Sequence, residues 1–162
     1  MIETDFTSDV LIFNLLRESD DEFINAFNIK FIDKSVPAME DNTIYVANLD
    51  LEPQRETFNS IMYSALTNVF IKTKNTDYVE ASRILRTVAK HIKTVLKTNV
   101  TCKQRHITFR NQTYEYGSNY TLQGLHLIIC MNELEILNDP DRPDLITDYD
   151  LDTEVIIDGK EE

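Results

Sequence analysis

Two cysteines and two histidines have the residue types that bind zinc. Cys102 and His106 are spaced C-x3-H, and His126 and Cys130 are spaced H-x3-C. Both segments are predicted as strands, and four residues along a strand span about 13 Å. Tetrahedral zinc holds its ligand atoms roughly 2.0–2.3 Å from one point. The spacing therefore disfavours zinc, and the sequence predicts no metal site.

The acidic run DYDLDTE near the C-terminus resembles the first half of a calcium-binding loop. Its carboxylates belong to Asp148, Asp150, Asp152 and Glu154. A calcium loop needs glycine at its sixth position and glutamate at its twelfth. This chain has Thr153 and Gly159 there, so the run is interpreted as a solvated acidic arm.

Signatures of catalysis and of cofactor binding are missing from the sequence. The chain has three glycines, Gly117, Gly124 and Gly159, and no phosphate-cradling loop, dinucleotide fingerprint or nucleophile elbow. His91 lies on a predicted basic helix with no evident partner, which favours a surface residue over a general base. We therefore expect a protein that is not an enzyme and that holds no cofactor.

Charge divides the chain into three parts. The formal net charge is −12, but residues 71–110 hold 10 basic and 2 acidic side chains. The segments on either side carry −9 and −11. Five of the basic residues recur at intervals of three and four on one predicted helix: Arg83, Arg86, Lys90, Lys93 and Lys97.

This basic stripe has three interpretations. It is a solvated helix face, a contact for nucleic-acid phosphates, or a contact for the acidic surface of another copy, where charge fixes register. The acidic ends would repel a polyanion, so the third interpretation is favoured over the second. The five residues are candidates for subunit or partner contacts.

The hydrophobic pattern predicts an α+β fold: a mixed or mostly antiparallel sheet with one long helix packed on one face, an N-terminal helix and an acidic C-terminal extension. Residues 1–137 are expected to form one domain and residues 138–162 an acidic arm or tail. Helices are expected over 9–17, from 19 and over 78–98, with Ser8 and Ser19 as N-caps of the first two. Strands are expected over 28–36, 43–49 and 57–72, with a loop at 50–56, and two hairpin strands start near 105 and 119.

The predicted hairpin turns near Ser118, which would pair Ile107 with Ile129 and turn odd-numbered positions to the core. Tyr114, Tyr116 and Tyr120 are expected to crowd at its tip. Tyrosine is enriched at protein interfaces, so the three are a second candidate contact, although strands favour tyrosine in any case.

The layout from about residue 9 to 133 resembles the tail terminator proteins of long-tailed bacteriophages. The resemblance lies in VFIKTKNTDYVEA, leading from strand to helix, and in a late strand, LQGLHLIICM, after a tyrosine-rich turn. It implies a fold with helices on one face of the sheet. It also implies a six-membered ring that stops tail-tube polymerisation and joins the tail to the neck of the head.

The resemblance also implies the partners: the chain itself, the tail-tube protein and a neck or connector protein. Genome DNA would pass through the ring lumen without sequence-specific binding. The expected location is the virion, with assembly in the host cytoplasm and no membrane contact, and two free cysteines fit a reducing compartment. Another neck or connector adaptor of the virion, or a cytoplasmic protein-binding module, is the alternative. The segment TEVIID (153–158) is a candidate strand for the sheet edge of another subunit.

Overall fold

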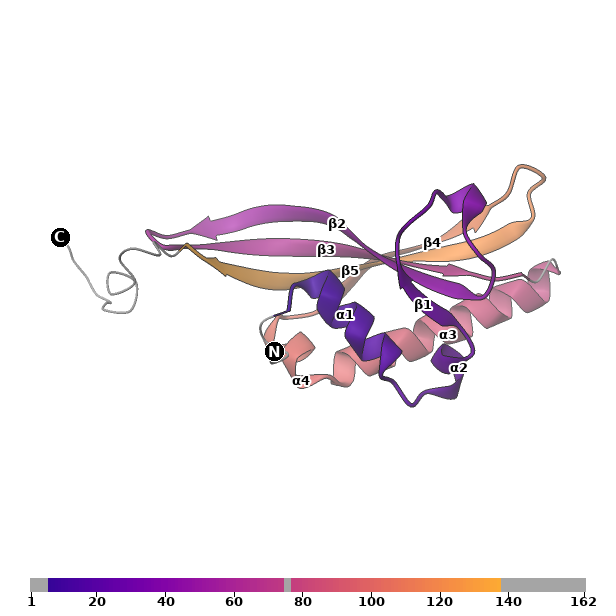
Figure 1. The fold of residues 1–162 in the computed structure, drawn as a ribbon, viewed down its shortest axis with the longest axis horizontal. Helices are drawn as coiled ribbons and strands as arrows, with labels where there is room; N and C mark the ends of the chain where they lie inside the picture. The colour runs from indigo at the N-terminus through magenta and orange to yellow at the C-terminus, as the bar shows by residue number, and fades with distance from the viewer. Residues whose placement is uncertain (1–5, 75–76, 138–162) are drawn as a thin grey trace. The chain divides into compact units, whose positions relative to one another are not determined.

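The computed structural model describes residues 6–74 and 77–137 (Figure 1). It confirms the α+β class, with a five-stranded mixed sheet and helices packed on it. The helices are α1 (Ser8–Arg17), α2 (Glu22–Asn25), the 3-10 helix η2 (Val36–Ala38), α3 (Tyr78–Thr98) and α4 (Val100–Gln104). The strands are β1 (Asn28–Phe31), β2 (Thr43–Glu56), β3 (Ser60–Lys72), β4 (Thr108–Tyr116) and β5 (Leu122–Ile136).

The strands lie in the order β1-β2-β3-β5-β4. β1 runs parallel to the first residues of β2, pairing Asn28 with Thr43 and Phe31 with Val46. β4 and β5 pair antiparallel. Within the described residues, β1 and β4 are therefore the two outermost strands, and β2 beyond Val46 has no neighbour on the side of β1.

Contacts divide the chain into two compact units. Of the described residues, 6–52, 64–74 and 77–133 belong to the main unit, and 53–63 and 134–137 belong to the second unit. β2, β3 and β5 each contribute residues to both units. The predicted arm, residues 138–162, lies outside the described residues.

The long helix α3 organises the core of the main unit, as its apolar periodicity predicts. Its buried residues are Ala81, Leu85, Val88, Ala89, Ile92 and Leu96. They join one hydrophobic cluster with residues of α1 and of the sheet, and α1, α3 and α4 lie on the same side of the sheet (Figure 1). Asp77 caps the helix by accepting a hydrogen bond from the Glu80 N–H.

Both predicted caps of the N-terminal helices are wrong by one or two residues. Thr7, not Ser8, is the N-cap of α1, and Ser8 is buried inside the helix. Asp21, not Ser19, caps α2, and its carboxylate accepts from the N–H groups of Phe23 and Ile24. The Ser19 hydroxyl instead accepts from the Asp21 N–H. Several polar residues compete here, and sequence alone does not rank them.

The loop predicted over residues 50–56 is wrong, because β2 continues to Glu56. Pro53 and the surrounding charges favoured a loop. Proline is tolerated in an edge strand, where its missing N–H points away from the sheet, and this part of β2 has an open side. The short helix α4 was also missed, since its five residues carry too little periodicity.

The predicted hairpin register is wrong by two residues. Phe109, rather than Ile107, pairs with Ile129. Irregularities between Phe109 and Asn111 and between Glu115 and Tyr116 then shift the pairing further, because a bulge adds a residue to one strand. Odd positions of β5 from Leu125 to Met131 are buried as expected. On β4 the shift brings Tyr114, an even position, against the core.

Candidate functional site

The basic residues of α3 lie beside the edge strand β4. The Arg86 guanidinium carbon stands 5.8 Å from the centre of the Tyr114 ring, and Lys93 Nζ donates to Gln112 Oε1 at 2.9 Å. The hydroxyls of Ser82 and Tyr114 are 3.0 Å apart. Three successive turns of α3 therefore meet β4. We call Arg83, Arg86, Lys90, Lys93 and Lys97 the basic face.

Arg83 is the member of the basic face whose charge is compensated. Its Nε and an Nη donate to the two carboxylate oxygens of Glu80 at 2.7 and 2.8 Å. This bidentate pair raises the pKa of Arg83 and lowers the pKa of Glu80. Because Arg83 is satisfied one turn away, it is a weaker candidate for a contact with another molecule.

Lys90 and Lys97 carry the uncompensated charge of the basic face. Both side chains are exposed, and neither makes an ion pair with any residue that the structure describes. Together with Lys93 they place three ammonium groups within two helical turns, on the side of α3 that meets β4. A strip of positive charge therefore borders the open edge of the sheet.

The three predicted tyrosines do not form one cluster. Tyr114 and Tyr116 are edge-to-face at 6.3 Å, and Tyr78 of α3 packs on Tyr114 at 6.5 Å. Burial and a hydrogen bond with Tyr78 raise the pKa of Tyr116. Tyr120 is 87% exposed in the β4–β5 turn with a left-handed φ of 64°. Tyr114 thus anchors β4 to α3, while Tyr120 is the tyrosine presented to solvent.

His91 has a partner that the sequence did not reveal. Its ring Nδ1 lies 2.6 Å from Asp21 Oδ2, and its ring contacts Phe23 at a centroid distance of 4.4 Å. Both partners belong to the region of α2, 70 residues away in the chain. The histidine therefore joins α3 to α2.

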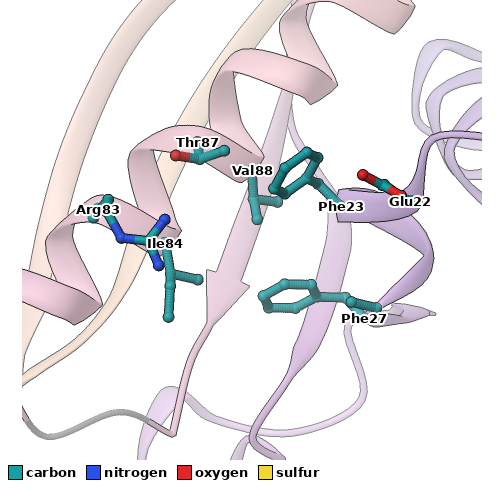
Figure 2. A pocket seen from close by; sticks show the side chains of 8 residues that line it. Glu22, Phe23, Phe27, Arg83, Ile84, Thr87 and Val88 are labelled. Carbon is teal, nitrogen blue, oxygen red and sulfur yellow. The ribbon is translucent and has the colours of Figure 1, made fainter.

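An apolar groove lies between α2 and α3 (Figure 2). It has a volume of about 360 Å³. Phe23 and Phe27 project toward Ile84 and Val88 of α3, and the remaining lining comes from Glu22, Ala26, Arg83 and Thr87. The ionisable groups that line this groove are the Glu22 carboxylate and the paired Arg83. These two groups do not make an acid–base pair for catalysis.

The cysteines and histidines considered for zinc lie in separate environments. Cys102 is buried in α4 and His106 follows it with a left-handed φ of 55°, so their predicted strand is wrong. Cys130 Sγ contacts Ser64 Oγ at 3.0 Å. His126 lies 3.2 Å from Glu115 and edge-on to Phe70. Among the described residues no three His, Cys, Asp or Glu side chains form a metal-binding group, and the proposed calcium residues lie outside them.

The second unit presents apolar side chains without a core beneath them. None of its described residues is buried, and Phe58 at the β2–β3 turn is 91% exposed. Leu134, Ile136 and Leu137 are exposed as well. The strands are held by backbone pairing and by Tyr63, whose hydroxyl donates to Glu135 at 2.9 Å, which raises the pKa of Tyr63.

No protein-family model and no curated protein matches this chain. No helix in the described ranges combines the length and the apolar character of a membrane span. A function is therefore inferred from the exposed surfaces of the protein.

Sequence reasoning missed three features of these surfaces. Asp21 and Gln112 were not singled out because their partners on α3 lie far away in the chain. Phe58 was placed inside a long strand, although Asn59 and Ser60 after it are typical of a turn. These two turn-forming residues were the available clue in the sequence.

Proposed function

We propose that this chain is a non-enzymatic assembly protein that forms a ring of identical copies and terminates the tail tube of a long-tailed bacteriophage. The family in this proposal comes from the resemblance in layout. The surfaces of the main and second units supply independent physical support for self-assembly. The role is structural, so it needs no catalytic residue.

The observation that carries the proposal is the exposure of β2. Nine consecutive residues of this strand, 48–56, are exposed, and Phe58 follows them. A small β-structure with no buried face is marginally stable in water. Exposed apolar side chains that gather on one element mark contact sites. A second copy that covers these strands would provide the missing core.

The charge pattern supports a contact between copies rather than a site for nucleic acid. The basic face lies in a protein of net charge −12. Charge complementarity between copies sets orientation and suppresses wrong contacts more than it adds affinity. A polyanion would meet the same basic face but would be repelled by most of the remaining surface. DNA inside the ring would therefore pass without specific binding.

The mechanism is capping. One face of the ring binds the last ring of the tube, and the opposite face offers no equivalent site, so growth stops there. That opposite face is then free to receive a neck protein. Each step uses surface complementarity alone.

Light scattering on the full chain, alone and with tail-tube protein, tests the proposal. We expect a species of about six times the 18.9 kDa monomer mass, alone or on tube ends. A chain that stays monomeric at all concentrations and does not bind tube ends would overturn it.

A further inference from the structure

β4 has an open edge in the main unit. Within the described residues it pairs with β5 alone. An edge strand presents a row of backbone N–H and C=O groups that a further strand can pair with. Six of the nine residues of β4 are exposed: 108, 110–113 and 116. The edge is therefore accessible.

β1, the other outermost strand, carries Lys30, whose ammonium group pairs with Glu40 at 3.0 Å. The open parts of β2 and β5 carry negative charge. β2 beyond Val46 has Asp50, Glu52 and Glu56 with one arginine, Arg55. The end of β5 has Glu133 and Glu135. β4 instead carries Arg110 and lies against Arg86 and Lys93. Its one acid, Glu115, is 3.2 Å from His126. Of the described edges, β4 alone is bordered by a basic face.

The chain also contains a strongly acidic segment with a short apolar run. Residues 138–162 have ten acidic and two basic side chains. Within them, TEVIID (153–158) has three consecutive β-branched apolar residues between acids, a composition that favours a strand. This segment matches β4 and the basic face in both charge and hydrogen-bonding capacity.

We propose that residues 153–158 of one copy add as a strand to the β4 edge of a second copy, beside the basic face of its α3. Backbone hydrogen bonds hold the added strand, and Lys90, Lys93 and Lys97 neutralise the carboxylates that flank it. This inference rests on the self-association in the proposed function and adds a second contact between copies, apart from the exposed part of β2.

The geometry of this contact suits a ring. The 15 residues from 138 to 152, which precede the donated strand, could span up to about 50 Å, enough to reach a neighbour. Each copy both donates a segment and offers an edge, so the contact joins two different surfaces. Repeated contacts of this head-to-tail kind close into a ring when the rotation between copies permits.

Disulfide trapping between two full-length variants tests the contact. The acceptor chain carries Asn111→Cys, Gln112→Cys or Thr113→Cys, one at a time, and the donor chain carries Ile156→Cys. The native Cys102 and Cys130 are buried and compete little. We expect a crosslinked pair of donor and acceptor for at least one β4 position. An Asn25→Cys acceptor, on an exposed residue of α2 outside both β2 and β4, is the control and should give none.

Charge exchange provides a second readout. Lys93→Glu on the acceptor should slow crosslinking roughly tenfold, because it places like charges together. Glu154→Lys on the donor should recover most of the loss. Absence of crosslinks at all three β4 positions, or equal crosslinking at Asn25→Cys, would overturn the inference.

The two proposals fail in different ways. Rings that cap tubes without any β4 crosslink would overturn the strand addition and leave the terminator role standing. Crosslinked copies that never bind a tube end would overturn the terminator role and leave the strand addition standing.

Discussion

His91 Nδ1 and Asp21 Oδ2 are 2.6 Å apart and join α3 to the residue that caps α2. Asp21 also accepts from the N–H groups of Phe23 and Ile24. One carboxylate thus begins a four-residue helix and fastens it to the longest helix of the protein. A helix this short is not stable alone, so α2 depends on this link and on the burial of Ile24.

Asp21→Ala should therefore lower the free energy of unfolding by about 1–2 kcal/mol, the usual cost of losing an N-cap. Asp21→Asn keeps a capping oxygen and loses the carboxylate charge beside His91, so it should cost about 0.5 kcal/mol. Denaturant unfolding of both variants measures this. Asp20→Ala, on the neighbouring exposed residue, is the control, and a similar loss there would contradict the assignment.

The cost of Asp21→Ala should depend on pH. Burial disfavours the Asp21 carboxylate, but hydrogen bonds from His91 and from the backbone N–H of Ile24 and Phe23 outweigh it. The pKa of Asp21 therefore lies below its usual 3.8. A lowered pKa stabilises the folded state above the unfolded value, and this stabilisation is lost as pH falls through the folded value. The difference from wild type should shrink as the pH falls below about 4; a difference that stays the same between about pH 5 and about pH 2 would contradict this.

Gly124→Ala should destabilise the sheet. A Cβ at Gly124 would lie 2.6 Å from the Ile71 carbonyl oxygen and 2.7 Å from the Phe70 ring, and neither can move away without disturbing β3. We expect a loss of about 1–3 kcal/mol, typical of overpacking. Gly117→Ala meets only the flexible Gln123 amide at 2.5 Å and should cost much less. Equal losses in thermal unfolding would show that the contact at Gly124 relaxes.

The sequence predicted α3 well because burial on one side imposes a helical period over 21 residues. Asp77 followed by that period marks its start. The register of β4 could not be predicted, since the strand contains two irregularities, between Phe109 and Asn111 and between Glu115 and Tyr116. An amphipathic helix can be predicted because its pattern lies within one short segment. The position of a bulge has no such local pattern.

For the basic face too, the sequence predicted the local pattern but not the tertiary contacts. Its five residues were found from spacing alone, but their position beside β4 follows from contacts such as Lys93 with Gln112. The extension of β2 to Glu56 was unpredictable for another reason. A strand with nine exposed residues has no alternation of apolar and polar positions that would identify it.

Lys90→Glu should stabilise the monomer and weaken assembly. In the helix, Lys90 is next to Arg86 and Lys93 at spacings of four and three, so the reversal replaces repulsion with attraction worth a few tenths of a kcal/mol, roughly. In assembly it should raise the dissociation constant about tenfold and reduce the salt dependence. Lys74→Glu makes the same charge change on an exposed residue outside α3. Equal effects of the two variants on assembly would mean that the net charge of the protein, and not the position of Lys90, controls assembly.

Phe58→Ser should weaken self-association without unfolding the monomer. Phe58 is 91% exposed, so the change in thermal stability should stay within about 0.5 kcal/mol. Burying a phenylalanine at a contact is worth about 1.5–3 kcal/mol, which corresponds to a tenfold or larger rise in the dissociation constant. Sedimentation velocity measures the association.

Val79→Ser is the control for Phe58→Ser. Val79 is 73% exposed on α3 in the main unit. The substitution therefore removes an exposed apolar side chain away from the β2–β3 turn. Association that falls equally in both variants would contradict a specific role for the β2–β3 turn.

The central claim is tested most directly by electron microscopy of tail tubes polymerised from the tail-tube protein of the same genome, with and without the full chain. The account predicts that the chain forms a ring on one end of each tube and that tubes stop growing once it is bound. Tubes of unchanged length with bare ends, at chain concentrations above those of the tube ends, would contradict it.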